Sequence, residues 1–175
     1  NLHCTYCMPA EGMDWLARSD VLSADEIIRL VQVAVSQLGI SKVRFTGGEP
    51  LVRPEIVRIV SGVKRLRTAS GRPVEVALTT NGLLLPRYLD ALVEAGLDRV
   101  NISLDTLDRD RYAQLARRDR LDDVLVAVDL AAASGLQPVK LNTVIMRGVN
   151  EVDIVPLARF ALVRGLELRY IEQMP

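Results

Sequence analysis

Apolar residues recur every three or four positions between Ser23 and Gly39, which is the spacing of one buried helix face. Ser23 and Glu26 carry the signature of a capping box, in which each side chain reaches the backbone amide of the other residue. Gly39 stands where a left-handed residue would end the helix. We therefore predict a helix whose apolar face consists of Ile27, Ile28, Val31, Ala34, Val35 and Leu38.

Along the rest of the chain, helical patterns alternate with short strand-like runs. Strands are predicted at Lys42–Phe45, Val74–Thr79, Arg99–Ser103, Val139–Ile145 and Leu166–Ile171. Further helices are predicted at about Pro54–Leu66, with the proline in the first turn, and at Arg87–Ala95, Leu121–Ala133 and Val152–Arg164. Such alternation with short links is typical of a parallel sheet covered by helices. We predict an α/β fold in one domain and expect one more strand upstream of Asn1.

Polar side chains interrupt four of these strands on one face only. Alternate residues of a strand share a face, and parallel strands buried on both faces are usually apolar throughout. The residues concerned are Arg44 and Thr46, Thr79 and Asn81, Asn101, Ser103 and Asp105, and Lys140 and Asn142. An unpaired Lys or Arg is costly to bury, so these groups need partners. We expect them to face a polar ligand inside a barrel; the alternative is that they pair with one another or lie near solvent.

Composition excludes several classes of function. The 175 residues include 22 basic and 22 acidic side chains, and no run of Lys and Arg forms a nucleic-acid footprint. The sequence contains no stretch of about 18 apolar residues, the length that a membrane-spanning helix needs. His3 is the one histidine, which excludes His-rich zinc sites and any Ser–His–Asp triad that does not use it. We expect a cytoplasmic protein without a membrane or nucleic-acid partner.

Two motifs carry candidate chemistry. Cys4 and Cys7, the only cysteines, are separated by two residues, a spacing that suits an iron–sulfur cluster, half of a zinc site or a redox pair. Gly47 and Gly48 precede Glu49 and Pro50 directly after a predicted strand. This run is either an ordinary tight turn or a place where a ligand approaches the backbone closely, with Glu49 accepting from a ligand amine.

Together these features resemble the radical S-adenosylmethionine (SAM) superfamily and, within it, the GTP 3′,8-cyclase family of molybdenum cofactor biosynthesis. The superfamily pattern lies in the cysteine pair and the Gly-Gly-Glu-Pro run. A cysteine immediately before Asn1 would complete the C-x3-C-x2-C motif, and we expect one there. The cyclase pattern covers essentially the whole chain, in segments 4–9, 43–51, 78–82, 100–105, 139–143, 147–150 and 171–175.

The resemblance implies a [4Fe–4S] cluster and SAM as cofactors, and it implies roles by position. Cys4 and Cys7 would ligate the cluster. The residues that would line the SAM site are Tyr6, Gly48, Ser103 and Met174. Those that would contact GTP are Arg44, Thr79 and Lys140, with the two cations placed for its phosphates. Supporting positions are Gly47, Glu49, Pro50, Asn81, Asn101, Asp105 and Asn142. No residue is assigned the bond-making step itself.

The implied fold is a partial (β/α) TIM-like barrel of the radical SAM type that lacks its first strand. The implied activity is that of a lyase: a reduced cluster splits SAM, and the resulting 5′-deoxyadenosyl radical removes hydrogen from C3′ of GTP. C3′ then bonds to C8, which gives (8S)-3′,8-cyclo-7,8-dihydroguanosine 5′-triphosphate. The protein would orient both substrates and exclude water. An electron donor would be a partner, and a homodimer of the full-length protein stays open.

We interpret residues 1–175 as one radical SAM core domain that is truncated at both ends. A second cysteine-bound cluster is expected in a region after Pro175, and the 175-residue chain by itself is expected to be inactive on GTP. Two other interpretations stay open. One is a radical SAM enzyme that acts on a peptide or another small molecule, and the other is a non-catalytic α/β domain that binds zinc.

Overall fold

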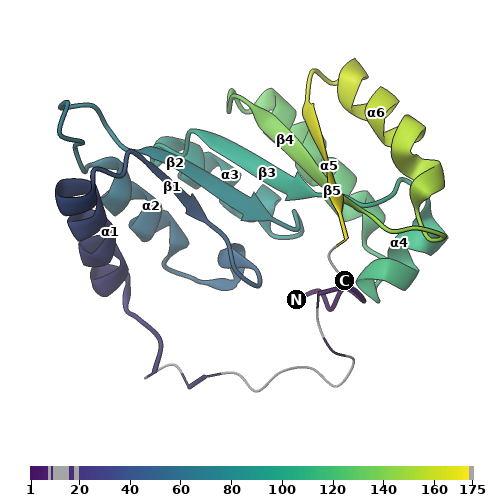
Figure 1. The fold of residues 1–175 in the computed structure, drawn as a ribbon, viewed down its shortest axis with the longest axis horizontal. Coiled ribbons are helices and arrows are strands. Elements are labelled where there is room, and N and C mark those ends of the chain that lie inside the picture. The colour runs from purple at the N-terminus through teal and green to yellow at the C-terminus, as the bar shows by residue number, and fades with distance from the viewer. Residues whose placement is uncertain (8, 10–15, 18–19, 174–175) are drawn as a thin grey trace.

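The computed structural model describes residues 1–7, 9, 16–17 and 20–173. Five parallel strands form one curved sheet in chain order (Figure 1). They are β1 (Lys42–Phe45), β2 (Glu75–Thr80), β3 (Arg99–Ser103), β4 (Val139–Ile145) and β5 (Glu167–Glu172). β1 and β5 lie at the two ends of this order and do not pair, so the described sheet is open. An open, curved parallel sheet is consistent with the predicted partial barrel.

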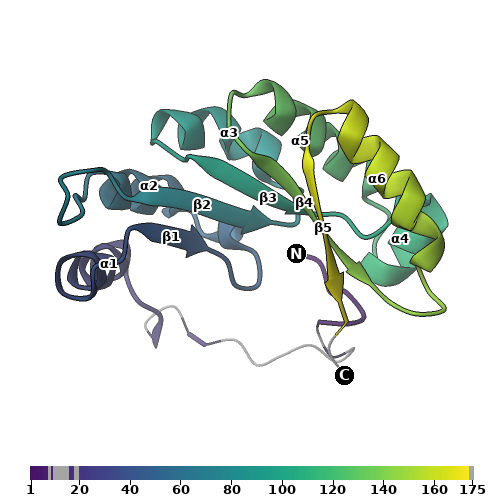
Figure 2. The same ribbon diagram turned by 45° about the horizontal axis from the view of Figure 1, so that its top comes forward.

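Helices cover the outer face of the sheet, and the opposite face stays open along much of its length (Figure 2). The α-helices are α1 (Ala24–Leu38), α2 (Ile56–Lys64), α3 (Leu85–Glu94), α4 (Arg109–Ala116), α5 (Leu121–Ala133) and α6 (Ile154–Val163). Two short 3-10 helices are η2 (Pro50–Val52) and η3 (Glu151–Asp153). No helix in the described part of the chain is long and apolar enough to cross a membrane.

The core lies between the sheet and the helices. Strand residues that point toward the helices are fully buried, among them Leu78, Ile102 and Leu141. Each such side chain contributes roughly 1.5–3 kcal/mol by leaving water. Their strand neighbours point to the open face and are mostly polar, so the sheet has one apolar and one polar side. This two-sidedness confirms the alternation seen in the sequence.

Most predicted elements are found in the structure. The bounds of β1, β3, β4 and α5 match those predicted, and β2 and β5 are shifted by one residue. α1 has the predicted capping box, with the Ser23 Oγ accepting from the Glu26 amide at 3.3 Å and the Glu26 carboxylate accepting from the Ser23 amide at 2.8 Å. Gly39 ends the helix at a φ of 70°, which a residue with a Cβ adopts only at a cost.

Several predictions were wrong in detail. The last helix, predicted from Val152, begins as α6 at Ile154, and the residues before it form η3. α2 begins at Ile56, so Pro54 lies in the turn before the helix; Pro50 instead occupies the first turn of η2. α3 begins at Leu85, two residues before the predicted start. An unpredicted helix, α4, stands between β3 and α5 and breaks the simple alternation of helix and strand.

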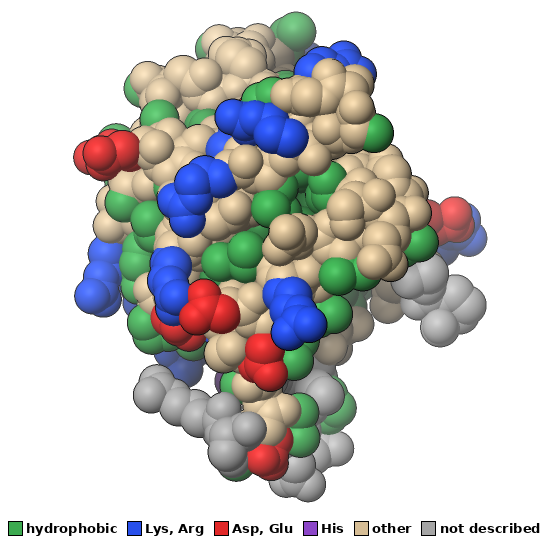
Figure 3. All heavy atoms as spheres, turned by 90° about the vertical axis from the view of Figure 1, so that its left-hand side faces the viewer, with side chains coloured by type: hydrophobic (Ala, Val, Ile, Leu, Met, Phe, Trp, Pro, Cys, Tyr) green, Lys and Arg blue, Asp and Glu red, His purple; other side chains and the backbone are tan. Residues whose placement is uncertain are grey.

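On the side of the molecule that carries α1, the Lys and Arg side chains are scattered among hydrophobic, uncharged and acidic groups (Figure 3). The cations on this face therefore do not merge into a single stripe of the kind that tracks a phosphate backbone.

Candidate functional site

Residues 1–7, which we call the cysteine loop, lie beside the carboxyl ends of the strands (Figures 1 and 2). Three hydrogen bonds join this loop to the rest of the described structure. The Asn81 Nδ2 donates to Asn1 Oδ1 at 2.6 Å, and the Thr5 amide donates to the carbonyl of Leu115 in α4 at 2.9 Å. The third joins the Tyr6 hydroxyl to Asp105 Oδ2 at 2.7 Å. Elements far apart in the sequence thus hold the loop in place.

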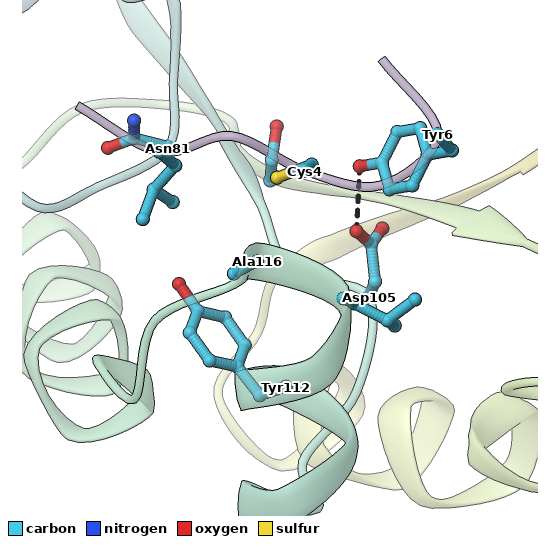
Figure 4. A pocket seen from close by; sticks show the side chains of 9 residues that line it. Cys4, Tyr6, Asn81, Asp105, Tyr112 and Ala116 are labelled. Atoms are coloured by element: carbon cyan, nitrogen blue, oxygen red, sulfur yellow. Dashed lines mark hydrogen bonds between the residues drawn. The ribbon is translucent and has the colours of Figure 1, made fainter. Parts of the chain in front are cut away.

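A small pocket lies between the loop, the strand ends and α4. Figure 4 shows the Tyr6 hydroxyl directed at Asp105, with Cys4 on the loop beside them and Tyr112 on α4. The lining residues are Leu2, Cys4, Tyr6, Asn81, Ser103, Asp105, Tyr112, Leu115 and Ala116. Four of these, Tyr6, Asn81, Ser103 and Asp105, were singled out from the sequence as SAM-site or supporting residues, and Cys4 as a cluster ligand. The pocket therefore brings together residues that the sequence analysis placed in one site.

Both cysteines are free thiols on one turn of the loop, since the Cys7 amide donates to the Cys4 carbonyl at 3.1 Å. Cys7 is exposed and Cys4 is half-buried. Burial, with smaller contributions from the neighbouring Cys7 and Asp105, raises the pKa of the Cys4 thiol to about 12. A thiol in such a setting keeps its proton until a metal displaces it, so metal binding here would release a proton.

Asp105 is the buried carboxyl group of the site, with 9% of its surface exposed. Burial raises its pKa, while hydrogen bonds from the Tyr6 hydroxyl and the Val144 amide act in the opposite direction. Burial and the adjacent Asp105 raise the pKa of Tyr6 above its usual value. Tyr6 therefore stays protonated and acts as the donor in this pair.

Along the open face of the sheet, the predicted polar residues stand in register. Thr79, Asn101 and Lys140 are Cα partners on neighbouring strands, and Lys140 in turn partners Glu167. The Asn101 Nδ2 donates to Thr79 Oγ1 at 3.0 Å, and Lys140 forms an ion pair with Glu167. These contacts favour internal pairing for this row of side chains, the alternative that the sequence had left open.

The next row along the same face behaves differently. Ser103 partners Asn142, which partners Arg169. The Oδ1 of Asn142 is buried and has no hydrogen-bond partner in the described part of the structure. An acceptor in this position is rare in a folded protein, and it fits a face that completes its hydrogen bonds with a ligand or water.

Arg44 does not need an internal partner, because it is exposed on the edge strand β1, and Thr46 is exposed just beyond that strand. These two residues thus match the alternative of a position near solvent, because β1 has a neighbour on one side only. Arg44 nevertheless lies on the open face, in register with Ala77 of β2. Within the five strands, the residues of that face include five cations and two carboxylates, namely Lys42, Arg44, Arg99, Lys140, Arg169, Glu75 and Glu167.

The Glu49 carboxylate joins the turn after β1 to the residues at the end of β2 by hydrogen bonds. Its Oε1 accepts from the Leu51 amide at 3.0 Å and from Thr80 Oγ1 at 2.8 Å, and its Oε2 accepts from the Asn81 amide at 2.7 Å. The preceding Gly47 has a φ of 134°, a backbone conformation that favours glycine, and Gly48 is exposed. The Gly-Gly-Glu-Pro run is thus a turn tied to the carboxyl end of β2.

Sequence reasoning missed two features of this region. Asn150 is fully buried, and its Nδ2 donates to the carbonyls of Asp105 and Val144 at 2.9 and 2.8 Å, while its Oδ1 accepts from the Met146 amide at 2.8 Å. The asparagine that follows Gly148 after a strand was the available signal. The second feature is α4, whose Tyr112 and Leu115 line the pocket. Met174, predicted to line the SAM site, lies outside the described residues.

Comparison with known proteins assigns the family. The family model described as the radical SAM superfamily matches residues 1–161. The chain belongs to the radical SAM superfamily. This membership supports a radical SAM enzyme over a non-catalytic zinc-binding domain, and it implies a [4Fe–4S] cluster and SAM as cofactors.

Several relatives of this radical SAM chain carry the name GTP 3′,8-cyclase. One from Corynebacterium glutamicum is 58% identical over all 175 residues, which make up 46% of its length. Others from Streptomyces coelicolor and Paenarthrobacter nicotinovorans are 54% and 49% identical over the whole chain, which covers 50% and 48% of their lengths. The chain spans about half the length of the curated relatives it matches.

Solved structures of proteins with low sequence identity share the fold. Streptococcus suis SuiB bound to S-adenosylmethionine matches 99% of the chain with a TM-score of 0.78 at 19% identity, over 36% of its own length. Methylornithine synthase (PylB) matches 100% of the chain with a TM-score of 0.74 at 20% identity, over 50% of its own length. The same strand order and helix arrangement therefore occur in proteins of very different sequence.

The residues of the cysteine loop fit the cluster that the family implies. Cys4 and Cys7 carry free thiols, the ligand type that iron–sulfur clusters use, and they share one turn beside a pocket. Within the described residues, no group of three or more His, Cys, Asp or Glu side chains is arranged to hold a metal ion. A complete cluster site therefore needs a further ligand, and the cysteine expected before Asn1 stays a prediction.

Proposed function

We propose that this chain is the core of a GTP 3′,8-cyclase, the lyase that converts GTP to its 3′,8-cyclised isomer in molybdenum cofactor biosynthesis. The observation that carries the proposal is the identity of 49–58%, over every residue of the chain, to proteins named GTP 3′,8-cyclase. Structures with about 20% identity support the fold alone and do not favour a peptide substrate over a nucleotide.

The cofactors would bind at the carboxyl ends of the strands. Cys4 and Cys7 would hold the cluster, which supplies, when bound, the electron that starts radical chemistry on SAM. The pocket beside Cys4 would take part of SAM, with Tyr6 and Ser103 in its wall and Gly48 nearby on the turn after β1. A half-buried site of this kind would keep water away from a reactive intermediate.

GTP would lie along the open face of the sheet. The surplus of cations over carboxylates on this face suits a triphosphate, which carries several negative charges. Arg44 is exposed and has no ion-pair partner among the described residues, so it is available to a phosphate group. Lys140 is only 8% exposed at its side chain and already pairs with Glu167, which is 53% exposed. A phosphate would share Lys140 with this carboxylate or displace it, while Thr79 and Asn101 would orient the same lysine.

A direct test is the reaction itself, carried out with the complete protein that contains this chain. The protein would be reconstituted anaerobically with iron and sulfide, supplied with SAM, a reductant and GTP, and its products analysed by mass spectrometry. The proposal predicts a product with the mass of GTP and a different retention time, together with consumption of SAM. Consumption of SAM with a peptide but not with GTP would contradict it.

The role of the cations has its own test. Arg44→Ala and Lys140→Met each remove a charged hydrogen bond to phosphate, so the KM for GTP is expected to rise roughly tenfold to a hundredfold. Arg58→Ala is the matched control, because Arg58 pairs with Asp25 on the outer surface of the molecule. An equal change in all three variants would contradict the placement of GTP on the open face.

The finer assignments belong to the same proposal. We place the protein in the cytoplasm, where its free thiols would stay reduced, with a one-electron donor as partner and no nucleic-acid or membrane partner. Residues 1–175 would form one core domain, and a homodimer of the full-length protein stays open. Sedimentation of the purified complete protein would decide its oligomeric state.

A further inference from the structure

We propose that Asp105 is a positioning residue, which fixes the cysteine loop against the carboxyl end of β4 before a cluster binds. The inference rests on the family's cluster site at Cys4 and Cys7 and goes beyond it. Asp105 would act through Tyr6 rather than by touching the cluster or a substrate.

The first observation is that Asp105 is itself held rigidly. Its Oδ1 accepts from the Val144 amide in β4 at 2.8 Å, and its backbone carbonyl accepts from the buried Asn150 at 2.9 Å. Asn150 also donates to the carbonyl of Val144, so the ends of β3 and β4 are joined through one side chain. A carboxylate fixed in this way can orient whatever binds to its second oxygen.

The second observation is that this second oxygen binds the cysteine loop. Asp105 Oδ2 accepts from the hydroxyl of Tyr6, which stands between Cys4 and Cys7 in the sequence (Figure 4). Of the three hydrogen bonds from the loop to the rest of the described structure, this is the one made by a side chain that stands between the two cysteines.

Because of these contacts, the cysteine loop would be ordered before the cluster forms. Two thiols on a mobile loop would have to be ordered when the cluster forms, and that ordering would weaken cluster binding. A loop that is already held by Asp105 avoids this cost. Asp105 then contributes to the retention of the cluster, and its contribution depends on hydrogen-bond geometry rather than on its charge.

Three variants of the complete protein separate geometry from charge. Tyr6→Phe loses the hydrogen bond to Asp105 but leaves the Val144 contact. Asp105→Ala loses both contacts. Asp105→Asn can keep both, because its oxygen can accept from Val144 while its amide donates to the Tyr6 oxygen.

The first readout uses the cluster-free protein and follows hydrogen exchange at the amides of Thr5 and Val144. Tyr6→Phe is expected to speed exchange at Thr5 roughly tenfold, the equivalent of one hydrogen bond, and to leave Val144 unchanged. Asp105→Ala is expected to speed exchange at both amides. Asp105→Asn is expected to stay within about twofold of the wild type at both.

The second readout follows the reconstituted protein and measures how fast an iron chelator removes iron. Release is expected to be roughly tenfold faster in Tyr6→Phe and Asp105→Ala, and close to wild type in Asp105→Asn. Asp98→Asn is the matched carboxylate control, because Asp98 also accepts from a strand amide, Val76, but at the amino ends of the strands. Tyr88→Phe on α3 controls for the loss of a phenol.

Two results would overturn the proposal. One is unchanged Thr5 exchange and iron release in Tyr6→Phe. The other is an Asp105→Asn variant as impaired as Asp105→Ala, which would mean that charge and not geometry matters. Neither readout uses GTP, so a protein that acts on another substrate would leave this test intact.

Discussion

The backbone amide of Thr5 donates to the carbonyl of Leu115 at 2.9 Å, which joins the cysteine loop to the last turn of α4. α4 is in turn held by Arg111, whose Nη1 lies 2.8 Å from Asp153 Oδ2 and 3.3 Å from Thr106 Oγ1. Asp153 is 4% exposed and Thr106 is fully buried. An ion pair on the far side of α4 therefore helps to place the loop that carries the cysteines.

Arg111→Met is expected to lower the free energy of unfolding by roughly 2–3 kcal/mol, because it leaves the buried Asp153 without its cation. Urea denaturation would measure the loss. Arg58→Met, which breaks an exposed ion pair with Asp25, should cost less than about 1 kcal/mol. Arg111→Met/Asp153→Leu should recover part of the loss, since no buried charge remains unpaired. If Arg111→Met and Arg58→Met lower the free energy of unfolding by the same amount, the ion pair of Arg111 and Asp153 does not hold α4 in place.

α4 also shows where sequence reasoning ended. Four of its eight residues are Arg, Asp, Arg and Gln, and the buried Tyr112, Leu115 and Ala116 mark a helical face for only one turn. The one clear signal was Asp108, whose side chain caps the helix by accepting from the Arg111 amide at 2.8 Å. A helix of eight residues with three buried positions gives too few periodic positions to be recognised.

The strands were predictable for the opposite reason. Most of them present an apolar face to the helices and a polar face to the open side, so alternation revealed both the strands and their candidate ligand residues. The alternation could not reveal the hydrogen-bond partners of these polar residues. Glu49 contacts Thr80 and Asn81, and Asn150 contacts Asp105. Both sets of contacts form only when the carboxyl ends of different strands come together in the fold.

Glu49→Gln tests whether this glutamate is structural in the protein without ligands. The carboxylate accepts three hydrogen bonds, and an amide in its place turns one acceptor into a donor that faces another donor. The expected loss in the free energy of unfolding is about 1.5–3 kcal/mol, measured by thermal and urea denaturation. Glu94→Gln on the exposed part of α3 is the control. A loss no larger than that of the control would mean that Glu49 is free to serve a ligand instead.

Ile102 and Ser103 are sequence neighbours on opposite faces of β3, and their substitutions should separate stability from binding. Ile102 is fully buried, so Ile102→Ala is expected to cost about 2–5 kcal/mol of unfolding free energy through the cavity it leaves. Ser103 is half-buried in the pocket wall, and Ser103→Ala should change stability by less than about 1 kcal/mol while weakening SAM binding. Denaturation and equilibrium dialysis with SAM would measure the two effects. Unchanged SAM affinity in Ser103→Ala would remove this residue from the proposed site.

The ion pair of Lys140 and Glu167 is expected to depend on pH. The hydrogen bond from Lys140 lowers the pKa of the Glu167 carboxyl below its ordinary value, with smaller contributions from the charges of Lys140, Arg169 and Arg99. A carboxyl whose pKa is lower in the folded state stabilises the fold above its unfolded pKa, about 4.3, and this contribution is lost as the pH falls through the folded pKa. The pair should therefore stay intact at neutral pH and open only in acid.

An NMR titration of the Glu167 carboxyl carbon would measure this pKa directly. In Lys140→Met the midpoint should rise toward the ordinary glutamate value, because the largest cause of the shift is removed. Lys42→Met is the control, since Lys42 pairs with Glu75 and is not among the causes of the shift at Glu167. An unchanged midpoint in Lys140→Met would mean that Lys140 is not bound to Glu167 in solution. Lys140 would then be free for a phosphate without any exchange of partners.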